Sequence, residues 1–228
     1  MKFGRFVCAV ALSLTASLNI EAIGQTAAMT RGISVRMALT KNAVTYTEAD
    51  HADAWVVAIT ADGRVFFGMK PVTSEELADT MKSTPRNRDA RLYIKSDARA
   101  PFAELSEVLA VARAVSFDSA VLLTTQPEAP GMGKMVAPKG LEVSLLPVSP
   151  ETVVVRLHDV GKPAPDLQVN HKEIHWAHLQ NALNQALQGQ DERKVVVTSD
   201  AGLLFAQLAQ VIDACISVNA RVVLPAQK

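Results

Sequence analysis

The chain has 228 residues, of which 23 are Lys or Arg and 23 are Asp or Glu, so its formal net charge is zero. No long run of one sign interrupts this balance, so the sequence lacks the positive field that attracts phosphate backbones, which argues against nucleic acid as a partner. The length allows one or two domains, since compact domains commonly hold roughly 100–150 residues.

The first 24 residues have the layout of a secretory signal peptide. Two basic residues precede an apolar stretch over residues 6–18, and the small residues Ala22 and Gly24 come before a cleavage position ahead of Gln25. The stretch is shorter than the about 20 apolar residues of a membrane-spanning helix, which favours cleavage. The alternative is a signal anchor that holds the chain in the inner membrane as a single-pass protein, with the rest facing the periplasm.

Residues 30–126 predict a first domain that begins with strands. A glycine-led strand starts at Gly32, and a run of five apolar residues that starts at Trp55 predicts a second strand. A turn follows at Asp62-Gly63.

Two helices and two further strands complete this domain. The first helix starts at Thr73, because Thr73 and Glu76 have the spacing of a capping box. The β-prone run at residues 92–94 then precedes a helix whose apolar residues recur at three- and four-residue steps from Phe102. A last strand starts at Ser119.

A segment rich in proline and glycine separates this domain from a second one. Residues 127–139 lack an apolar period and predict a linker. Residues 140–228 then start again with a glycine-led strand, "GLEVSLLP". The same kinds of element follow in the same order.

The second domain repeats the first in sequence. The segment "RLYIKSDARAPFAELSEVLAVARAV" from Arg91 aligns with "KVVVTSDAGLLFAQLAQVIDACISV" from Lys194 at an offset of 103, and eight of the 25 positions are identical. Upstream the offset is 102, and the segment from Phe67 aligns with the segment from Val169. We therefore expect an α+β fold with two tandem copies of a two-layer domain, each a small mixed β-sheet with two helices on one face.

The order of elements in each copy, with "LYIKSDARAPFAELSEVLAVARAV" and "VVVTSDAGLLFAQLAQVIDACISV" as its core, resembles the periplasmic domain of the ExbD/TolR biopolymer transport family. The resemblance covers nearly all of residues 32–125 and 140–225. In that family the periplasmic domain dimerises and engages envelope components. The resemblance implies that the two copies pack together as a covalent substitute for this dimer.

The resemblance also implies a non-enzymatic protein of the cell envelope that binds an envelope protein or peptidoglycan, with a homo-oligomer and contact with an inner-membrane motor complex as open alternatives. In the family a transmembrane aspartate serves a proton-driven motor. Here residues 6–18 contain no Asp, Glu or His, although a proton relay inside a membrane needs an ionisable side chain. The alternative reading is a membrane-anchored ExbD-like transport subunit, and a metal-binding enzyme is a more remote one.

Asp97 and Asp200 occupy the same place in the two copies, at the end of a strand and before a helix. They are candidates for partner binding. The structural alternative is that each carboxylate accepts hydrogen bonds from the turn and opposes the dipole of the following helix, which is the more usual role of an Asp in this position.

Three histidines lie together in the sequence at His171, His175 and His178. The last two are one helical turn apart and could share a metal ion. They also align with the capping positions of the first copy, so the expectation is a helix start and no metal. No cofactor motif and no catalytic constellation appears in the sequence.

Overall fold

The computed structural model describes residues 33–85, 90–126, 136–146 and 152–225. The predicted signal peptide and Gly32 lie outside these residues, as does most of the predicted linker. We refer to residues 33–126 as the first half and to residues 136–225 as the second half.

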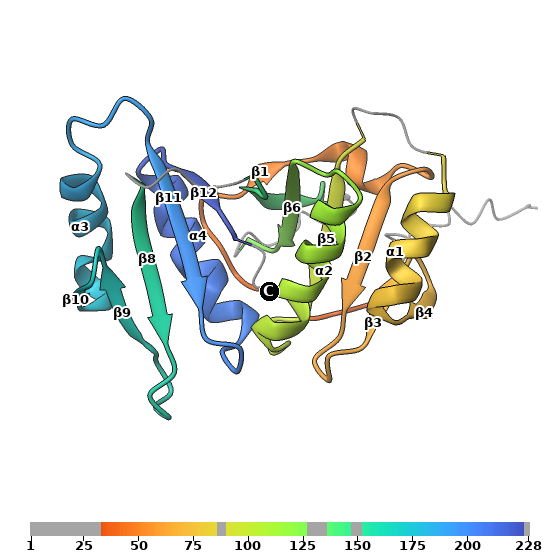
Figure 1. Cartoon of the computed structure of the whole chain (residues 1–228), viewed down its shortest axis with the longest axis horizontal. Coiled ribbons are helices and arrows are strands. Elements are labelled where there is room, and N and C mark those ends of the chain that lie inside the picture. Colours follow the sequence, from red (N-terminus) through yellow and green to blue (C-terminus); the bar gives the residue numbers. More distant parts are fainter. Residues whose placement is uncertain (1–32, 86–89, 127–135, 147–151, 226–228) are drawn as a thin grey trace, which may run out of the picture.

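From β2 onward the elements of the first half follow the predicted order, whereas β1 and η1 were not predicted (Figure 1). They are β1 (Val44–Thr45), the 3₁₀ helix η1 (Thr47–Asp50), β2 (Trp55–Ile59), β3 (Val65–Phe67), β4 (Lys70–Val72), α1 (Ser74–Ser83), β5 (Leu92–Ser96), α2 (Phe102–Ala114) and β6 (Ser119–Thr124).

The second half repeats this order after an opening strand. Its elements are β7 (Lys139–Ser144), β8 (Val153–His158), β9 (Asp166–Val169), β10 (Lys172–Ile174), the 3₁₀ helix η2 (Trp176–His178), α3 (Leu179–Ala186), β11 (Lys194–Ser199), α4 (Phe205–Ser217) and β12 (Arg221–Val223).

The expected α+β class is confirmed, and the strands of both halves join in one mixed sheet of 12 strands. Eleven of them run in the order β10-β9-β8-β11-β12-β7-β6-β5-β2-β3-β4, and β1 pairs with β7. On either side of β7 the order is the same when counted outward, because β12, β11, β8, β9 and β10 correspond to β6, β5, β2, β3 and β4. The sheet therefore has an approximately symmetric plan about its centre.

The join between the halves is the antiparallel pair β6–β7, which runs from Ser119 opposite Ser144 to Thr124 opposite Lys139. On its other side β7 pairs with β12 in parallel. Gly140 allows the close approach to β6, because a Cβ atom there would lie 2.5 Å from Val121 Cγ1 and 3.0 Å from the Leu122 carbonyl oxygen.

The strand expected from Gly32 does not extend into the described residues 33–35. The chain instead makes a single parallel bridge between Leu39 and Thr125, at the end of β6. The edge of β6 that such a strand would have filled carries β7, whose Leu141 and Val143 are fully buried.

The four α-helices cover one face of the sheet (Figure 1). A single apolar core lies between the helices and the sheet, and it takes residues from both halves, including Leu105 and Leu122 from the first and Phe205 and Leu208 from the second. A smaller cluster lies on the opposite face of the first half, where Tyr46 and Ala49 pack with Tyr93 and Val121. The segment that carries η1 thus covers that face.

The predicted capping box is present at the start of α1. The Thr73 hydroxyl accepts a hydrogen bond from the Glu76 amide at 3.2 Å, and the Glu76 carboxylate accepts one from the Thr73 amide at 2.9 Å. In the second half His175 caps the 3₁₀ helix η2, since its Nδ1 accepts from the Ala177 amide at 3.3 Å. The regular helix α3 therefore starts later, at Leu179.

Candidate functional site

The two helices that follow the aspartate loops begin side by side at the middle of the molecule (Figure 1). The Phe102 amide, at the start of α2, donates to the Leu203 carbonyl at 2.7 Å, and the Phe205 amide, at the start of α4, donates to the Ala100 carbonyl at 2.9 Å. Pro101 and Leu204 form an antiparallel bridge between these two bonds. We call this contact the central junction, formed by residues 97–103 and 200–206.

A second pair of hydrogen bonds follows the same rule. The Ala103 amide donates to the Ala201 carbonyl at 3.1 Å, and the Ala206 amide donates to the Ala98 carbonyl at 2.9 Å. In each pair, replacing the donor and acceptor of one hydrogen bond by the equivalent residues of the other half, 103 positions away, gives the other hydrogen bond. This reciprocity is the pattern that a two-fold axis gives in a homodimer.

The central junction also provides acceptors for backbone amides at the start of each helix. The first four amides of an α-helix have no acceptor within the helix. In α2 and α4 the first two amides find acceptors in the opposite half of the chain. The junction is therefore part of the folded structure of both helices.

Asp97 is buried beside this junction, with 3% of its surface exposed. Its carboxylate accepts hydrogen bonds from the backbone amides of Arg36 and Arg99, both at 3.0 Å, and from the Arg99 guanidinium at 2.9 and 3.1 Å. The bonds from the Arg99 side chain are the largest cause that lowers the pKa of Asp97 to about 2. These contacts support the structural reading of Asp97.

Asp200 has the same backbone position but a more open carboxylate, with 46% of its side chain exposed. It accepts a hydrogen bond from the Asp159 amide at 2.9 Å, and the Nδ1 atom of His158 lies 3.5 Å away. Gly202 stands where the first half has Arg99, so no arginine closes over this carboxylate. Asp200 therefore has the more accessible of the two carboxylates.

The three histidines do not form a metal-binding cluster in the described residues. The rings of His175 and His178 are 6.2 Å apart between centroids, and His171 lies in the turn between β9 and β10 with φ of 67°. Within the described ranges, no group of three or more His, Cys, Asp or Glu side chains is close enough to hold a metal ion.

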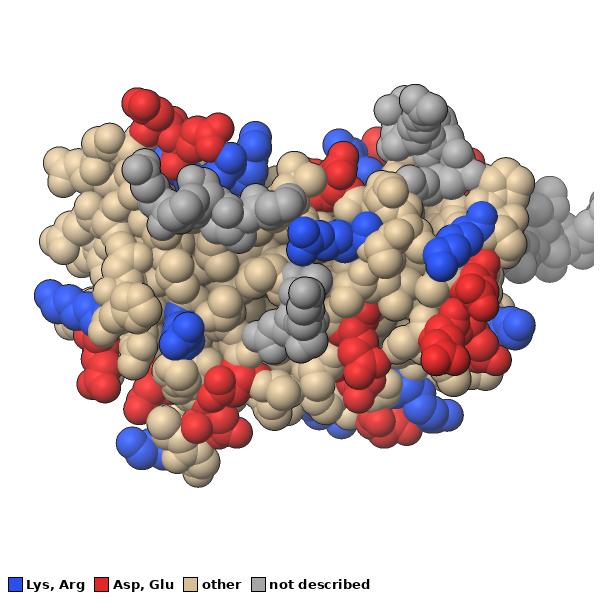
Figure 2. Space-filling view, in the orientation of Figure 1, with Lys and Arg blue, Asp and Glu red and all other residues tan. Residues whose placement is uncertain are grey.

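Two edge strands end the sheet, and they differ in an important way at their middle residue. In β4 the middle residue is Pro71, which has no amide proton, whereas β10 has Glu173 at the corresponding position. The face that carries the helices shows acidic and basic side chains interspersed, without one dominant sign (Figure 2). Among the described residues, no charged patch stands out on this face.

Sequence reasoning missed the arginines that hold Asp97. The contact with Arg99 could have been predicted, because an arginine two residues after a turn aspartate can reach back to the carboxylate. The contact with Arg36 could not have been predicted, since the Arg36 amide reaches Asp97 from a segment 61 residues away.

Three comparisons with known proteins bear on the identity of the chain. The family model described as biopolymer transport protein ExbD/TolR matches twice, over residues 23–128 and residues 121–228. No curated protein and no solved structure matches. In the part of the chain that the structure describes, no helix is both long and apolar enough to cross a membrane.

Proposed function

The chain belongs to the ExbD/TolR family of biopolymer transport proteins, and from this we propose that it is a non-enzymatic periplasmic protein whose two halves act as one partner-binding unit. The family suggests a location in the cell envelope. The double match supports the division into residues 30–126 and 140–228 with a linker over residues 127–139. The expected partner is an envelope protein or a peptidoglycan component.

The reciprocal central junction supports the idea that the two copies replace a dimer within one chain. In a homodimer a two-fold interface uses the same surface patch of both subunits. Here residues 97–103 and 200–206 meet in that manner. A covalent pair also lets the copies diverge, as the contrast between Arg99 and Gly202 illustrates.

The observation that carries the proposal is the open edge of β10. A two-residue turn, Asn170-His171, joins β9 to β10, so Val169 and Lys172 form the closing pair. Residues of an antiparallel strand alternate between backbone groups that face the neighbour and groups that face away. The amide and carbonyl of Glu173 therefore face outward, where an extended peptide could add as a further strand.

The opposite edge is blocked. Pro71 is the equivalent of Glu173 at the offset of 102, and it pairs with Phe66 at the middle of the β3–β4 hairpin. Because proline cannot donate a hydrogen bond, β4 lacks the outward donor that β10 keeps. A partner strand is therefore expected to bind β10 and not β4.

Replacing Glu173 by proline should weaken docking while preserving the fold. The first half already tolerates proline at this position, and the outward amide takes no part in the β9–β10 ladder. Loss of one backbone hydrogen bond together with the ring on the docking edge is expected to weaken partner binding by about tenfold or more. The measurement is recovery of envelope proteins and peptidoglycan fragments on the immobilised protein, compared between the wild type and Glu173→Pro.

Pro71→Glu is the matched control, because it exchanges the same two residue types at the opposite edge. Partners that bind β10 should be recovered by Pro71→Glu at least as well as by the wild type, because β10 is unchanged and β4 gains an outward amide. Equal recovery by the wild type and by Glu173→Pro would contradict docking at this edge.

A further inference from the structure

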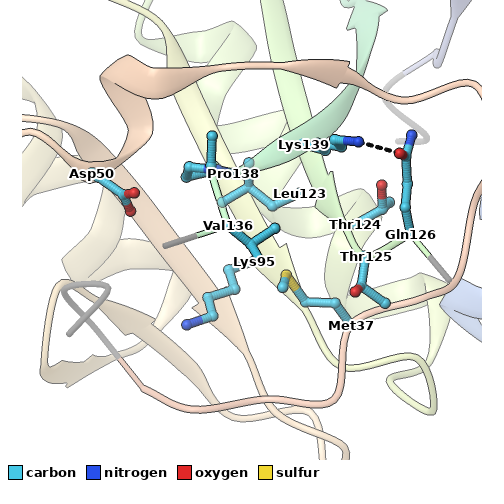
Figure 3. Close-up of a pocket in the computed structure, with 11 residues that line it drawn as sticks. Met37, Asp50, Lys95, Leu123, Thr124, Thr125, Gln126, Val136, Pro138 and Lys139 are labelled. Carbon is cyan, nitrogen blue, oxygen red and sulfur yellow. Dashed lines mark hydrogen bonds between the residues drawn. The ribbon is translucent and has the colours of Figure 1, made fainter. Parts of the chain in front are cut away.

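A cavity of about 280 Å³ lies on the face of the sheet opposite the helices, between the ends of β5 and β6 and the segments that cover them (Figure 3). It is separate from the edge of β10 and from the central junction. Its walls combine apolar and polar side chains: Met37, Asp50, Lys95, Leu123, Thr124, Thr125, Gln126, Val136, Ala137, Pro138 and Lys139.

Lys95 is a charged residue in the middle of an otherwise uncharged strand. It is only 7% exposed, and its neighbours Ile94 and Ser96 are fully buried. Because successive side chains of a strand point to opposite faces, Lys95 projects away from the helix core and toward the cavity (Figure 3). Its ammonium has no hydrogen bond, and no ion pair within 4.0 Å, among the described residues.

An ammonium in such surroundings is costly unless it is paired. Burial lowers the pKa of Lys95, and the Asp50 carboxylate acts in the opposite direction. The rest of the cavity does not pair with it either, since Lys139 donates to the Gln126 side chain and Thr124 bonds to Thr40. The cavity thus contains the ammonium of Lys95 without a paired group among the described residues.

Asp50 supplies an opposite charge in the same cavity. Its Oδ1 atom is buried and has no hydrogen-bond partner. It is near enough to influence Lys95, yet the two charged groups do not meet within 4.0 Å. Both residues line the same cavity, Lys95 from β5 and Asp50 from the end of η1 (Figure 3).

We propose that this cavity binds a small zwitterion of the amino acid or dipeptide class, with its carboxylate at Lys95 and its ammonium at Asp50. A simple anion would be repelled by Asp50 and a simple cation by Lys95, whereas a molecule that carries both charges satisfies both groups. The apolar side chains of Met37, Leu123 and Val136 would contact its carbon atoms.

The volume agrees with a ligand of this size. A cavity of about 150 Å³ holds benzene, and sites for drug-sized molecules begin near roughly 300 Å³. At about 280 Å³ this cavity lies between these limits, close to the upper one. One or two amino acid residues fit this range, and a longer peptide would have to leave the cavity.

The charge of Lys95 has no counterpart in the second half. At the offset of 103 the position of Lys95 is occupied by Thr198, which carries no charge. A ligand of this class is therefore expected to bind once per chain.

The test is calorimetric titration of the full chain with alanyl-alanine as the probe. Two blocked forms accompany it: N-acetyl-alanyl-alanine lacks the ammonium, and alanyl-alanine amide lacks the carboxylate. We expect saturable binding of alanyl-alanine at one site per chain and binding at least about tenfold weaker for each blocked form.

Two variants identify the groups that recognise the probe. Lys95→Met removes the charge with an unbranched side chain that is one atom shorter, and it should weaken binding of alanyl-alanine at least about tenfold. Asp50→Asn should weaken it similarly and should remove the discrimination against the N-acetyl form. Lys70→Met and Asp79→Asn make the same changes at exposed positions outside the cavity and should bind as the wild type does.

Circular dichroism establishes that each variant is folded before titration. The proposal is overturned if the folded wild type shows no saturable binding of alanyl-alanine or of any standard amino acid up to about 10 mM. It is equally overturned if folded Lys95→Met binds the probe as tightly as the wild type.

Discussion

Replacing Phe205 by alanine is expected to lower the free energy of unfolding of the entire chain by about 3–5 kcal/mol. Phe205 is fully buried, and it stands at the first position of α4, where its amide binds the first half. Because one sheet and one core run through both halves, the loss should act on both together. A change in the second half should therefore destabilise the first half to the same extent.

The two tryptophans of the chain report on the halves separately, since Trp55 lies in β2 and Trp176 lies in η2. Guanidinium unfolding is followed by fluorescence in Trp176→Phe, which retains Trp55, and in Trp55→Phe, which retains Trp176. When Phe205→Ala is added to each protein, the unfolding midpoint should fall in both. The loss in free energy of unfolding should be the same in the two proteins.

Phe102→Ala makes the corresponding change in the first half, and it should again move both midpoints. Leu204→Ala is the neighbouring control: Leu204 is 39% exposed, so its truncation should change stability far less. A loss confined to the Trp176 signal in Phe205→Ala would show that the halves unfold independently, contrary to the continuous sheet.

Asp97→Asn is expected to destabilise the protein by about 2–3 kcal/mol, whereas Asp200→Asn should change the stability by less than about 0.5 kcal/mol. At Asp97 the substitution removes a buried carboxylate that accepts four hydrogen bonds, two of them from the Arg99 guanidinium. At Asp200 the carboxylate is half-exposed, and water can replace its contacts. Urea unfolding of the two variants measures the difference.

The same residue should make the wild type sensitive to acid. An Asp in an unfolded chain has a pKa near about 3.9, and the pKa of Asp97 in the folded protein is lowered to about 2. Its contribution is therefore fully present above pH about 4 and is lost as the pH falls through about 2. Over this window the wild type should lose roughly 2 kcal/mol more than Asp97→Asn does. Parallel loss in the two proteins would refute the role assigned to Asp97.

Local patterns in the sequence predicted most of the elements. The spacing of Thr73 and Glu76 indicated the capping box that the structure contains. The run of five apolar residues from Trp55 indicated a buried strand. These features depend on residues close in the chain, and the internal repeat allowed each to be checked against a second copy.

The way in which the two copies pack together could not be predicted from such local patterns. The choice of β7 as the neighbour of β6 depends on which of two glycine-led segments fits that edge, and the fit depends on contacts such as that of Gly140 with Val121. Such contacts join residues far apart in the sequence. The cavity was missed for the same reason, because Lys95 and Asp50 come to line the same space only after η1 folds over the sheet.

Hydrogen exchange at the central junction tests the packing of the two halves most directly. The amides of Phe102, Ala103, Phe205 and Ala206 occupy the first two positions of their helices, where only the opposite half offers acceptors. Ser74 and Glu75 occupy the same positions in α1 and have no acceptor in the described structure.

We expect the four junction amides to exchange at least about 100-fold more slowly than those of Ser74 and Glu75, which corresponds to about 3 kcal/mol of protection. Exchange of the junction amides as fast as that of Ser74 and Glu75, with the middles of α2 and α4 still protected, would show that the two halves fold without packing against each other.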